Sequence, residues 1–175
     1  MNFKLIDNFL EKEVYQKISD YLTSQDIPWF FRNIDVTGDE NGSTKNKNGF
    51  YNFCFYNEFK PDHPSFYEFM PPILDKLKVR ALIQIRANLT FRDIDTKESA
   101  FHSDYEYNNS TTGILYLSTC NAKTILKIKD EEIAVDSVEN RMLLFPTNIL
   151  HKAVYQDDLH KRYVINFNFF GEPWL

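Results

Sequence analysis

His102 and Asp104 form an H-x-D pair, in which an imidazole and a carboxylate are separated by one residue. We expect residues 100–104 to be extended, and on an extended segment residues i and i+2 project from the same face. Both side chains can therefore reach one metal ion. In a chain with 4 His and 25 acidic residues such a pair is common by chance, so the assignment needs support from the rest of the sequence.

His151 provides that support, because it begins another expected strand and adds a second imidazole. Two histidines and one carboxylate occupy one face of an octahedral iron and leave the other positions open. Open positions are typical of a metal that takes part in chemistry. The other histidines, His63 and His160, lie in polar, turn-forming segments, and we expect both at the surface.

Arg162 begins the segment 162–170, in which polar and apolar residues alternate. One face would carry Arg162, Val164, Asn166 and Asn168, and the other would carry Tyr163, Ile165, Phe167 and Phe169. The pattern suits a strand between a solvated cavity and a layer of helices, and exposure of the polar face to bulk solvent is the alternative. We expect 151–155 and 162–170 to form a hairpin that turns His151 and Arg162 toward one cavity, with His151 opposite Val164 or Asn166.

The elements that must position these residues are mostly short strands. Apolar spacing predicts a helix over 11–22, capped by Asp7 or Asn8, and a second helical segment over 65–77. Extended segments are predicted at 3–6, 27–32, 50–59, 81–91, 100–104, 112–118, 124–128, 132–135, 141–145, 151–155 and 162–170. This number of strands implies a mainly β fold with flanking α-helices, built as a sandwich or barrel such as the jelly roll.

The segment 81–91 shows the alternation over its whole length. Its apolar set is Ile83, Ile85, Ala87 and Leu89, and its polar set is Gln84, Arg86, Asn88 and Thr90. The polar segments 33–49, 92–99 and 105–111 are candidate covers for the mouth of a cavity. The first contains several glycines and no apolar periodicity, so we expect a long loop that serves either as a lid or as a simple connection.

The bulk composition excludes several classes of protein. With 175 residues, of which 43% are apolar and 16% aromatic, the chain suits one folded domain over 1–175. No apolar run approaches the ~18 residues that cross a bilayer, and a net charge of −5 disfavours binding to a nucleic-acid backbone. Cys54 and Cys120 lack C-x-x-C spacing and no signal-peptide pattern is present, so we expect buried thiols and a cytoplasmic protein.

The ordered set of motifs resembles the Fe(II)/2-oxoglutarate oxygenase superfamily, nearest to its small prolyl-hydroxylase-like members. The resemblance rests on Phe101-His-Ser-Asp104, Gly113-Ile-Leu-Tyr-Leu-Ser118, Arg141-Met-Leu-Leu-Phe145, His151 and Arg162-Tyr-Val-Ile-Asn-Phe-Asn168. It spans about residues 81–170, and the opening residues 3–10 and the helix after them are similar to the start of such proteins. It implies a double-stranded β-helix, which is a jelly-roll or cupin-like core.

The resemblance also implies the roles of the residues. His102, Asp104 and His151 would bind Fe(II), and Arg162 would pair with the distal carboxylate of 2-oxoglutarate. Co-substrate contacts are also implied for Tyr116, Asn88 and Thr124. Relatives often have asparagine where this chain has Ser118, which is a departure from the pattern.

The implied reaction consumes O2 and 2-oxoglutarate, releases succinate and CO2, and hydroxylates a prime substrate, with ascorbate as a possible supporting reductant. The substrate would be a small molecule or a peptide, for example a prolyl residue, an amino acid or a metabolite. The sequence does not indicate an oligomeric state.

Two other functions stay open. A nucleic-acid demethylase of the same superfamily would carry R-x-N-x-x-x-R-like residues in its last strand, but here the match stops at Arg162 and Asn166 is displaced from the pattern. A non-catalytic cupin-like module would bind metal without forming succinate, but it gives no reason for an arginine at position 162.

Overall fold

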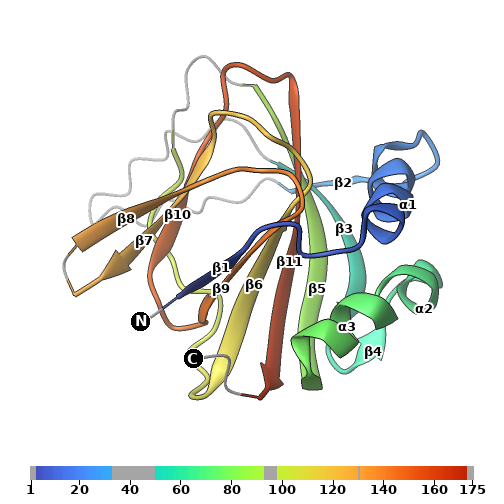
Figure 1. The fold of residues 1–175 in the computed structure, drawn as a ribbon, viewed down its shortest axis with the longest axis horizontal. Helices are drawn as coiled ribbons and strands as arrows, with labels where there is room; N and C mark the ends of the chain where they lie inside the picture. The colour runs from blue at the N-terminus through green and yellow to red at the C-terminus, as the bar shows by residue number, and fades with distance from the viewer. Residues whose placement is uncertain (1–2, 33–49, 93–97, 130, 173–175) are drawn as a thin grey trace.

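The computed structural model describes residues 3–32, 50–92, 98–129 and 131–172 of the chain. The elements (Figure 1) are β1 (Lys4–Ile6), α1 (Lys12–Thr23), β2 (Phe30–Arg32), β3 (Phe50–Asn57), β4 (Lys60–Pro61), α2 (Ser65–Phe69), α3 (Pro71–Leu77), β5 (Val79–Phe91), β6 (Ser110–Tyr116), β7 (Lys123–Ile128), β8 (Glu131–Asp136), β9 (Arg141–Pro146), β10 (His151–Val154) and β11 (Lys161–Gly171). The predicted loop 33–49 lies outside the described residues.

The strands form two antiparallel sheets. The large sheet has the order β1-β9-β6-β11-β5-β3-β2, with β4 paired to β3, and the small sheet has the order β10-β7-β8. All three helices lie on the side of the large sheet that faces away from the small sheet (Figure 1). The mainly β architecture with flanking helices that the sequence predicts is therefore confirmed.

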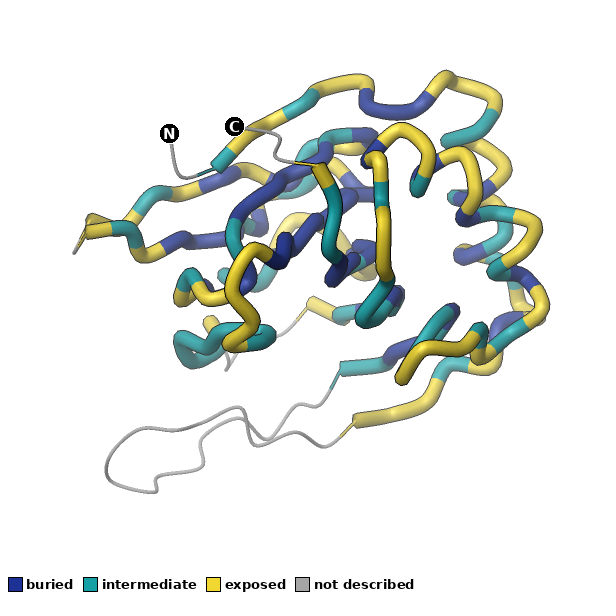
Figure 2. Tube along the Cα trace, turned by 90° about the horizontal axis from the view of Figure 1, so that it is seen from below, coloured by how far each residue is buried: buried dark blue, intermediate teal, exposed yellow. Residues whose placement is uncertain are grey.

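Alternation along the central strand β11 creates two apolar layers. Ile165, Phe167 and Phe169 belong to the cluster that packs between the large sheet and the helices. Val164 belongs to a smaller cluster with residues of the small sheet, such as Leu126 and Val135. In Figure 2 the buried positions concentrate in the strands, whereas the helices alternate between buried and exposed positions. The period-two pattern of the sequence therefore corresponds to the two faces of this sheet.

The helices differ from the prediction in their details. Helix α1 begins one residue late, and no side chain caps it. Asp7 instead accepts hydrogen bonds from the Arg141 guanidinium at 2.5 and 3.1 Å, and Asn8 adopts a positive φ of 50° in the preceding turn. The predicted helix over 65–77 is two helices, because the Pro71-Pro72 pair starts a new helix after Met70.

The predicted hairpin between 151–155 and 162–170 is wrong. Strand β10 pairs with β7 in the small sheet, where His151 lies opposite Leu126, and β11 pairs with β5 and β6 in the large sheet. The connection between them crosses from one sheet to the other instead of folding back. It is held there by Gln156, a fully buried side chain whose Nε2 donates to the Thr90 carbonyl at 3.1 Å.

Residues 100–104 do not form the regular strand that the sequence predicts, so this prediction is also wrong. Within this segment only His102 makes a bridge, an isolated one to His151.

No helix in the described part of the chain is long and apolar enough to cross a membrane. The cytoplasmic location stays a prediction.

Candidate metal centre

The bridge between His102 and His151 joins the segment before β6 to the first residue of β10. The amide of His102 donates to the carbonyl of His151 at 3.0 Å, and the amide of His151 donates to the carbonyl of His102 at 2.8 Å. Directly opposed residues have neighbouring side chains. The two ring centroids are accordingly 4.4 Å apart.

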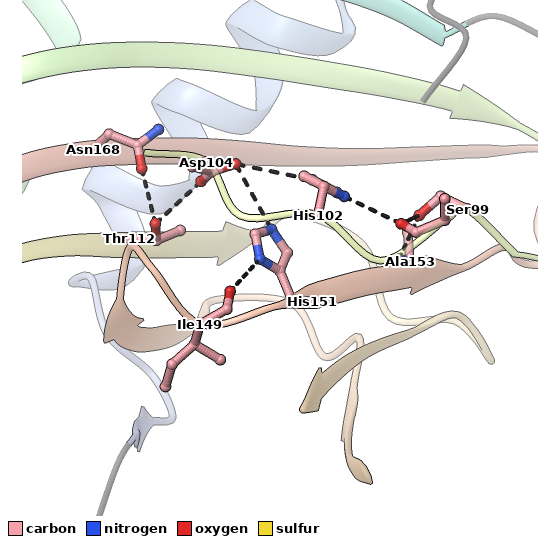
Figure 3. Close-up of polar contacts among 9 residues, drawn as sticks. Ser99, His102, Asp104, Thr112, Ile149, His151, Ala153 and Asn168 are labelled. Atoms are coloured by element: carbon pink, nitrogen blue, oxygen red, sulfur yellow. Dashed lines mark hydrogen bonds and ion pairs between the residues drawn. The ribbon is translucent and has the colours of Figure 1, made fainter. Parts of the chain in front are cut away.

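Asp104 completes a cluster of three potential metal ligands (Figure 3). Its Oδ1 lies 3.9 Å from His102 Nε2 and 3.7 Å from His151 Nε2, and the ligand atoms of the three residues all lie within 4.8 Å of one another. Ligand atoms about 2.0–2.2 Å from a shared metal are separated from each other by roughly 3–4 Å. The cluster therefore has the dimensions of a metal site.

The hydrogen bonds of both imidazoles leave Nε2 available as the ligand atom. His102 Nδ1 lies 3.2 Å from the Ala100 carbonyl, and His151 Nδ1 lies 3.1 Å from the Ile149 carbonyl. A carbonyl only accepts hydrogen bonds, so each Nδ1 carries the hydrogen and each Nε2 keeps a lone pair. This is the usual arrangement of metal-binding histidines.

Burial favours the neutral form of His151. Its side chain is 5% exposed, and it packs against the Phe145 ring at a centroid distance of 5.0 Å. Burial lowers the pKa of His151 below its ordinary value, although the Asp104 carboxylate acts in the opposite direction. A neutral imidazole is the form that binds a metal.

Asp104 is oriented by a polar pair on the large sheet. Thr112 Oγ1 lies 3.1 Å from Asp104 Oδ2 and 2.9 Å from the carboxamide of Asn168. A hydroxyl has one hydrogen, so Thr112 donates to Asp104 when the Asn168 carboxamide is turned to donate to Thr112. Such outer partners fix the orientation of a metal-binding carboxylate.

A cavity of about 300 Å³ lies beside this cluster and extends between the two sheets. His102, Asp104 and His151 line it, together with Arg162 from β11. The sequence prediction that His151 and Arg162 face one cavity holds, although the predicted hairpin does not. The two residues face each other from different sheets instead of from neighbouring strands.

Arg162 is a buried cation without a counter-ion among the described residues. It is 4% exposed, and burial lowers its pKa. Its Nε donates to Ser137 Oγ at 3.3 Å, and its guanidinium lies 5.6 Å from the centroid of the Tyr116 ring. A buried charge is costly unless an opposite charge pairs with it. The Arg162 end of the cavity is therefore suited to an anion.

Solved structures of known proteins share this architecture. A prolyl-4-hydroxylase from Pseudomonas putida matches with a TM-score of 0.71 and 10% identity, over 98% of this chain and 93% of that one. A 2OG-Fe(II) oxygenase family oxidoreductase from Burkholderia pseudomallei matches with a TM-score of 0.71 and 11% identity, over 96% of this chain and 85% of that one.

A prolyl hydroxylase from Trichoplax adhaerens, in complex with a peptide fragment of the hypoxia inducible factor oxygen degradation domain, matches with a TM-score of 0.66 and 15% identity, over 97% of this chain and 84% of that one. The chain has the 2OG-Fe(II) oxygenase fold. No protein-family model matches the sequence, and no curated protein matches it. The jelly-roll core predicted from the motifs is thus confirmed by structural similarity.

Within this oxygenase fold the other predicted co-substrate residues gather near Arg162. Tyr116 Oη donates to Thr124 Oγ1 at 2.8 Å, and Thr124 and Asn88 line the cavity. Tyr116 is fully buried behind this wall, and burial raises its pKa to about 12, so it stays protonated. Ser118, the departure from the family pattern, has a structural contact, because its Oγ accepts a hydrogen bond from the Tyr163 amide at 3.1 Å.

The sequence reasoning missed several residues of the cavity wall. Arg86 and Asn166 both line it, from neighbouring strands of the large sheet. The alternation in 81–91 and 162–170 places each of them on the same face as a predicted co-substrate residue. That signal was available, but an alternating strand does not show which part of its polar face meets a cavity.

The remaining histidines and the cysteines have other environments. His160 is exposed, as predicted. His63 is partly buried and less exposed than predicted, because its ring packs against the Phe53 ring at a centroid distance of 5.0 Å. Cys54 and Cys120 are free and only partly buried, and desolvation raises the pKa of Cys54 to about 11, so its thiol is a poor nucleophile.

Proposed function

We propose that the chain is a single-domain Fe(II)- and 2-oxoglutarate-dependent oxygenase that hydroxylates a small molecule or a peptide. One observation carries this proposal: the His102–Asp104–His151 cluster lines the same cavity as the buried Arg162, which has no counter-ion among the described residues. The oxygenase fold supports it. The peptide bound to the Trichoplax prolyl hydroxylase makes a peptide one reasonable substrate class.

The donor set fits ferrous iron. Two imidazole nitrogens and one carboxylate oxygen on one side of a cavity match the ligands of non-haem Fe(II) oxygenases, which leave positions for the co-substrate and O2. When bound, the iron would supply oxygen activation coupled to the decarboxylation of 2-oxoglutarate to succinate and CO2. The protein supplies the geometry, the charges and the exclusion of water.

Arg162 would hold the distal carboxylate of 2-oxoglutarate. A guanidinium can donate two parallel hydrogen bonds to a carboxylate, and this pairing is stronger when both groups are buried. The Tyr116 ring below the guanidinium and the Ser137 hydroxyl at its Nε limit its motion. Thr124 and the carboxamide nitrogen of Asn88 are placed to contact the same co-substrate from the cavity wall.

The test begins with binding. Fe(II) and then 2-oxoglutarate are titrated by calorimetry into the metal-free protein without oxygen, and succinate and O2 consumption are measured afterwards in air. We expect both ligands to bind and succinate to form. Fe(II) binding without 2-oxoglutarate binding would instead assign the chain to the non-catalytic cupin-like modules.

Asp104→Ala tests the metal ligands. Loss of the only anionic ligand should weaken Fe(II) binding by about a hundredfold or more, since even the loss of an outer partner costs about tenfold to a hundredfold. Glu106→Ala is the control, because Glu106 is an exposed carboxylate two positions away. Fe(II) affinity of the Asp104 variant within about twofold of wild type, which is under ~0.5 kcal/mol, would remove Asp104 from the site.

A further inference from the structure

Three cationic side chains line the cavity, namely Arg86, Lys152 and Arg162. Lys152 is compensated, because its Nζ lies 3.2 Å from Glu98 and 3.7 Å from Glu132. Under the proposed function, Arg162 pairs with the distal carboxylate of 2-oxoglutarate. Arg86 has no carboxylate oxygen within 4.0 Å of its guanidinium among the described residues, so its charge is left without a direct partner.

The surroundings of Arg86 contain further unpaired polar atoms. Across the described residues, the buried side-chain nitrogen and oxygen atoms without a hydrogen-bond partner are Arg86 Nε, Asn88 Oδ1, Asn166 Oδ1 and Asn52 Nδ2. These residues are neighbours on the large sheet: Arg86 lies opposite Asn166, and Asn88 lies opposite Asn52. Unpaired buried groups are rare in folded proteins, and three of these four residues, Arg86, Asn88 and Asn166, line the cavity, which indicates a ligand that would pair with them.

The three cavity-lining residues Arg86, Asn88 and Asn166 lie toward the metal centre. Asn166 is two residues from Asn168, whose carboxamide contacts Thr112, the hydrogen-bond partner of Asp104. Arg162 lies four residues from Asn166 in the other direction along β11, which corresponds to about 13 Å of strand. Because the Arg162 guanidinium is held beside Ser137 and Tyr116, we assign the distal carboxylate of 2-oxoglutarate to it and Arg86 to a second ligand.

We infer that the prime substrate is a free amino acid, with its carboxylate bound by Arg86 and its amino group donating to the carboxamide oxygens of Asn88 and Asn166. The inference rests on the proposed function and adds the class of substrate. A guanidinium pairs best with a carboxylate, and the two unpaired carboxamide oxygens need N–H donors. The interior of a polypeptide offers no backbone carboxylate to Arg86. A cavity of about 300 Å³ is also at the small end of ligand sites.

The experiment measures binding to the protein loaded with Fe(II) and saturating 2-oxoglutarate, without oxygen. A panel of free amino acids is titrated by calorimetry, each beside its carboxamide, which has the same side chain and amino group but no carboxylate. We expect at least one free acid to bind and its amide to bind at least tenfold more weakly. Mass spectrometry in air should then find an added oxygen atom in that amino acid.

Arg86→Gln should weaken the binding of that amino acid at least tenfold. The control is Arg80→Gln on the same strand, because the Arg80 side chain is 70% exposed and pairs with Glu172 outside the cavity; it should keep wild-type affinity for the amino acid. Circular dichroism reports whether each variant is folded. The comparison of acid and amide uses only the wild-type protein, so it tests the inference even if Arg86→Gln does not fold.

Three results would overturn the inference. In the first, no free amino acid binds although 2-oxoglutarate does. In the second, acid and amide bind equally. In the third, Arg86→Gln weakens 2-oxoglutarate and not the amino acid, which would assign Arg86 to the co-substrate. Failure of wild-type protein to bind 2-oxoglutarate would contradict the proposed function itself, so the two failures are distinguishable.

Discussion

The two faces of the large sheet are similarly buried but differ in chemistry, and strand β11 shows both. On the outer face Ile165, Phe167 and Phe169 are at most 1% exposed and pack among the residues between sheet and helices. On the inner face Arg162 and Asn168 are 4% and 2% exposed, yet both are polar. Burial alone therefore does not separate the core from the candidate site.

The difference lies in whether the buried groups have partners within the protein. The outer face is apolar, and its side chains are satisfied by packing. Among the described residues, the inner face holds the buried Arg162 guanidinium without a counter-ion and the carboxamide oxygen Asn166 Oδ1 without a hydrogen-bond partner. A fold tolerates such groups when a ligand completes them. Substitutions on the inner face should therefore change ligand binding, whereas substitutions on the outer face should change the stability of the fold.

Phe167→Ala should give the largest effect and act on stability. Phe167 is fully buried, and its truncation leaves a cavity in the core, which costs about 3–5 kcal/mol of unfolding free energy. Urea unfolding of the metal-free protein measures it. The matched change on the inner face, Asn166→Ala, should cost less than about 1 kcal/mol, because it removes an acceptor that has no partner. Equal losses in the two variants would refute the contrast between the faces.

Arg162→Ala should act on ligand binding instead. Loss of the charge-assisted hydrogen bonds should weaken 2-oxoglutarate at least tenfold, consistent with about 1.5–3 kcal/mol for a hydrogen bond to a charged group. Fe(II) affinity should stay within about twofold of wild type, since Arg162 does not contact the metal cluster. Arg162→Lys should be intermediate, because lysine keeps the charge without the paired donors. Calorimetry with each ligand separates these results, and unchanged 2-oxoglutarate affinity would show that another residue holds the carboxylate.

Thr112→Val should have a smaller effect, confined to the metal end of the inner face. Valine keeps the shape of threonine but removes the hydroxyl that lies 3.1 Å from Asp104 Oδ2, so Fe(II) affinity should fall about tenfold, or ~1.4 kcal/mol. Thr124→Val is the control at the Arg162 end and should leave Fe(II) affinity within about twofold. The assignment fails if Thr124→Val weakens Fe(II) as much as Thr112→Val does.

The smallest effect concerns pH. Burial places the pKa of His151 in the folded protein below the ordinary value of 6.5, so the unfolded chain binds a proton first as the pH falls. The metal-free protein should therefore lose stability as the pH falls through 6.5, whereas above 6.5 the residue has no effect. Urea midpoints at about pH 7.5 and about pH 5.5 measure this, and His151→Gln should show a smaller difference between them. An identical pH dependence in wild type and variant would indicate that His151 is not held neutral.

Much of the site could be predicted from the sequence. The spacing of His102 and Asp104, a later His151 and the alternating strand from Arg162 identified four side chains that the structure brings to one cavity. Arg86 and Asn166 could not be selected, because their importance depends on which atoms lack partners. That property emerges only when neighbouring strands are in register.

Residue types and their periodicity, which act locally, were enough to place most strands and both faces of β11. The pairing of distant strands was not predictable in this way. His151 and Arg162 were expected in one hairpin, but the chain crosses between sheets, so that β10 pairs with β7 and the two residues face each other across the cavity. The segment around His102 forms no regular strand, and an isolated bridge joins it to His151. Local patterns set which side of a strand is polar, but strand pairing is set by packing of the whole chain, and this decided where the polar sides meet.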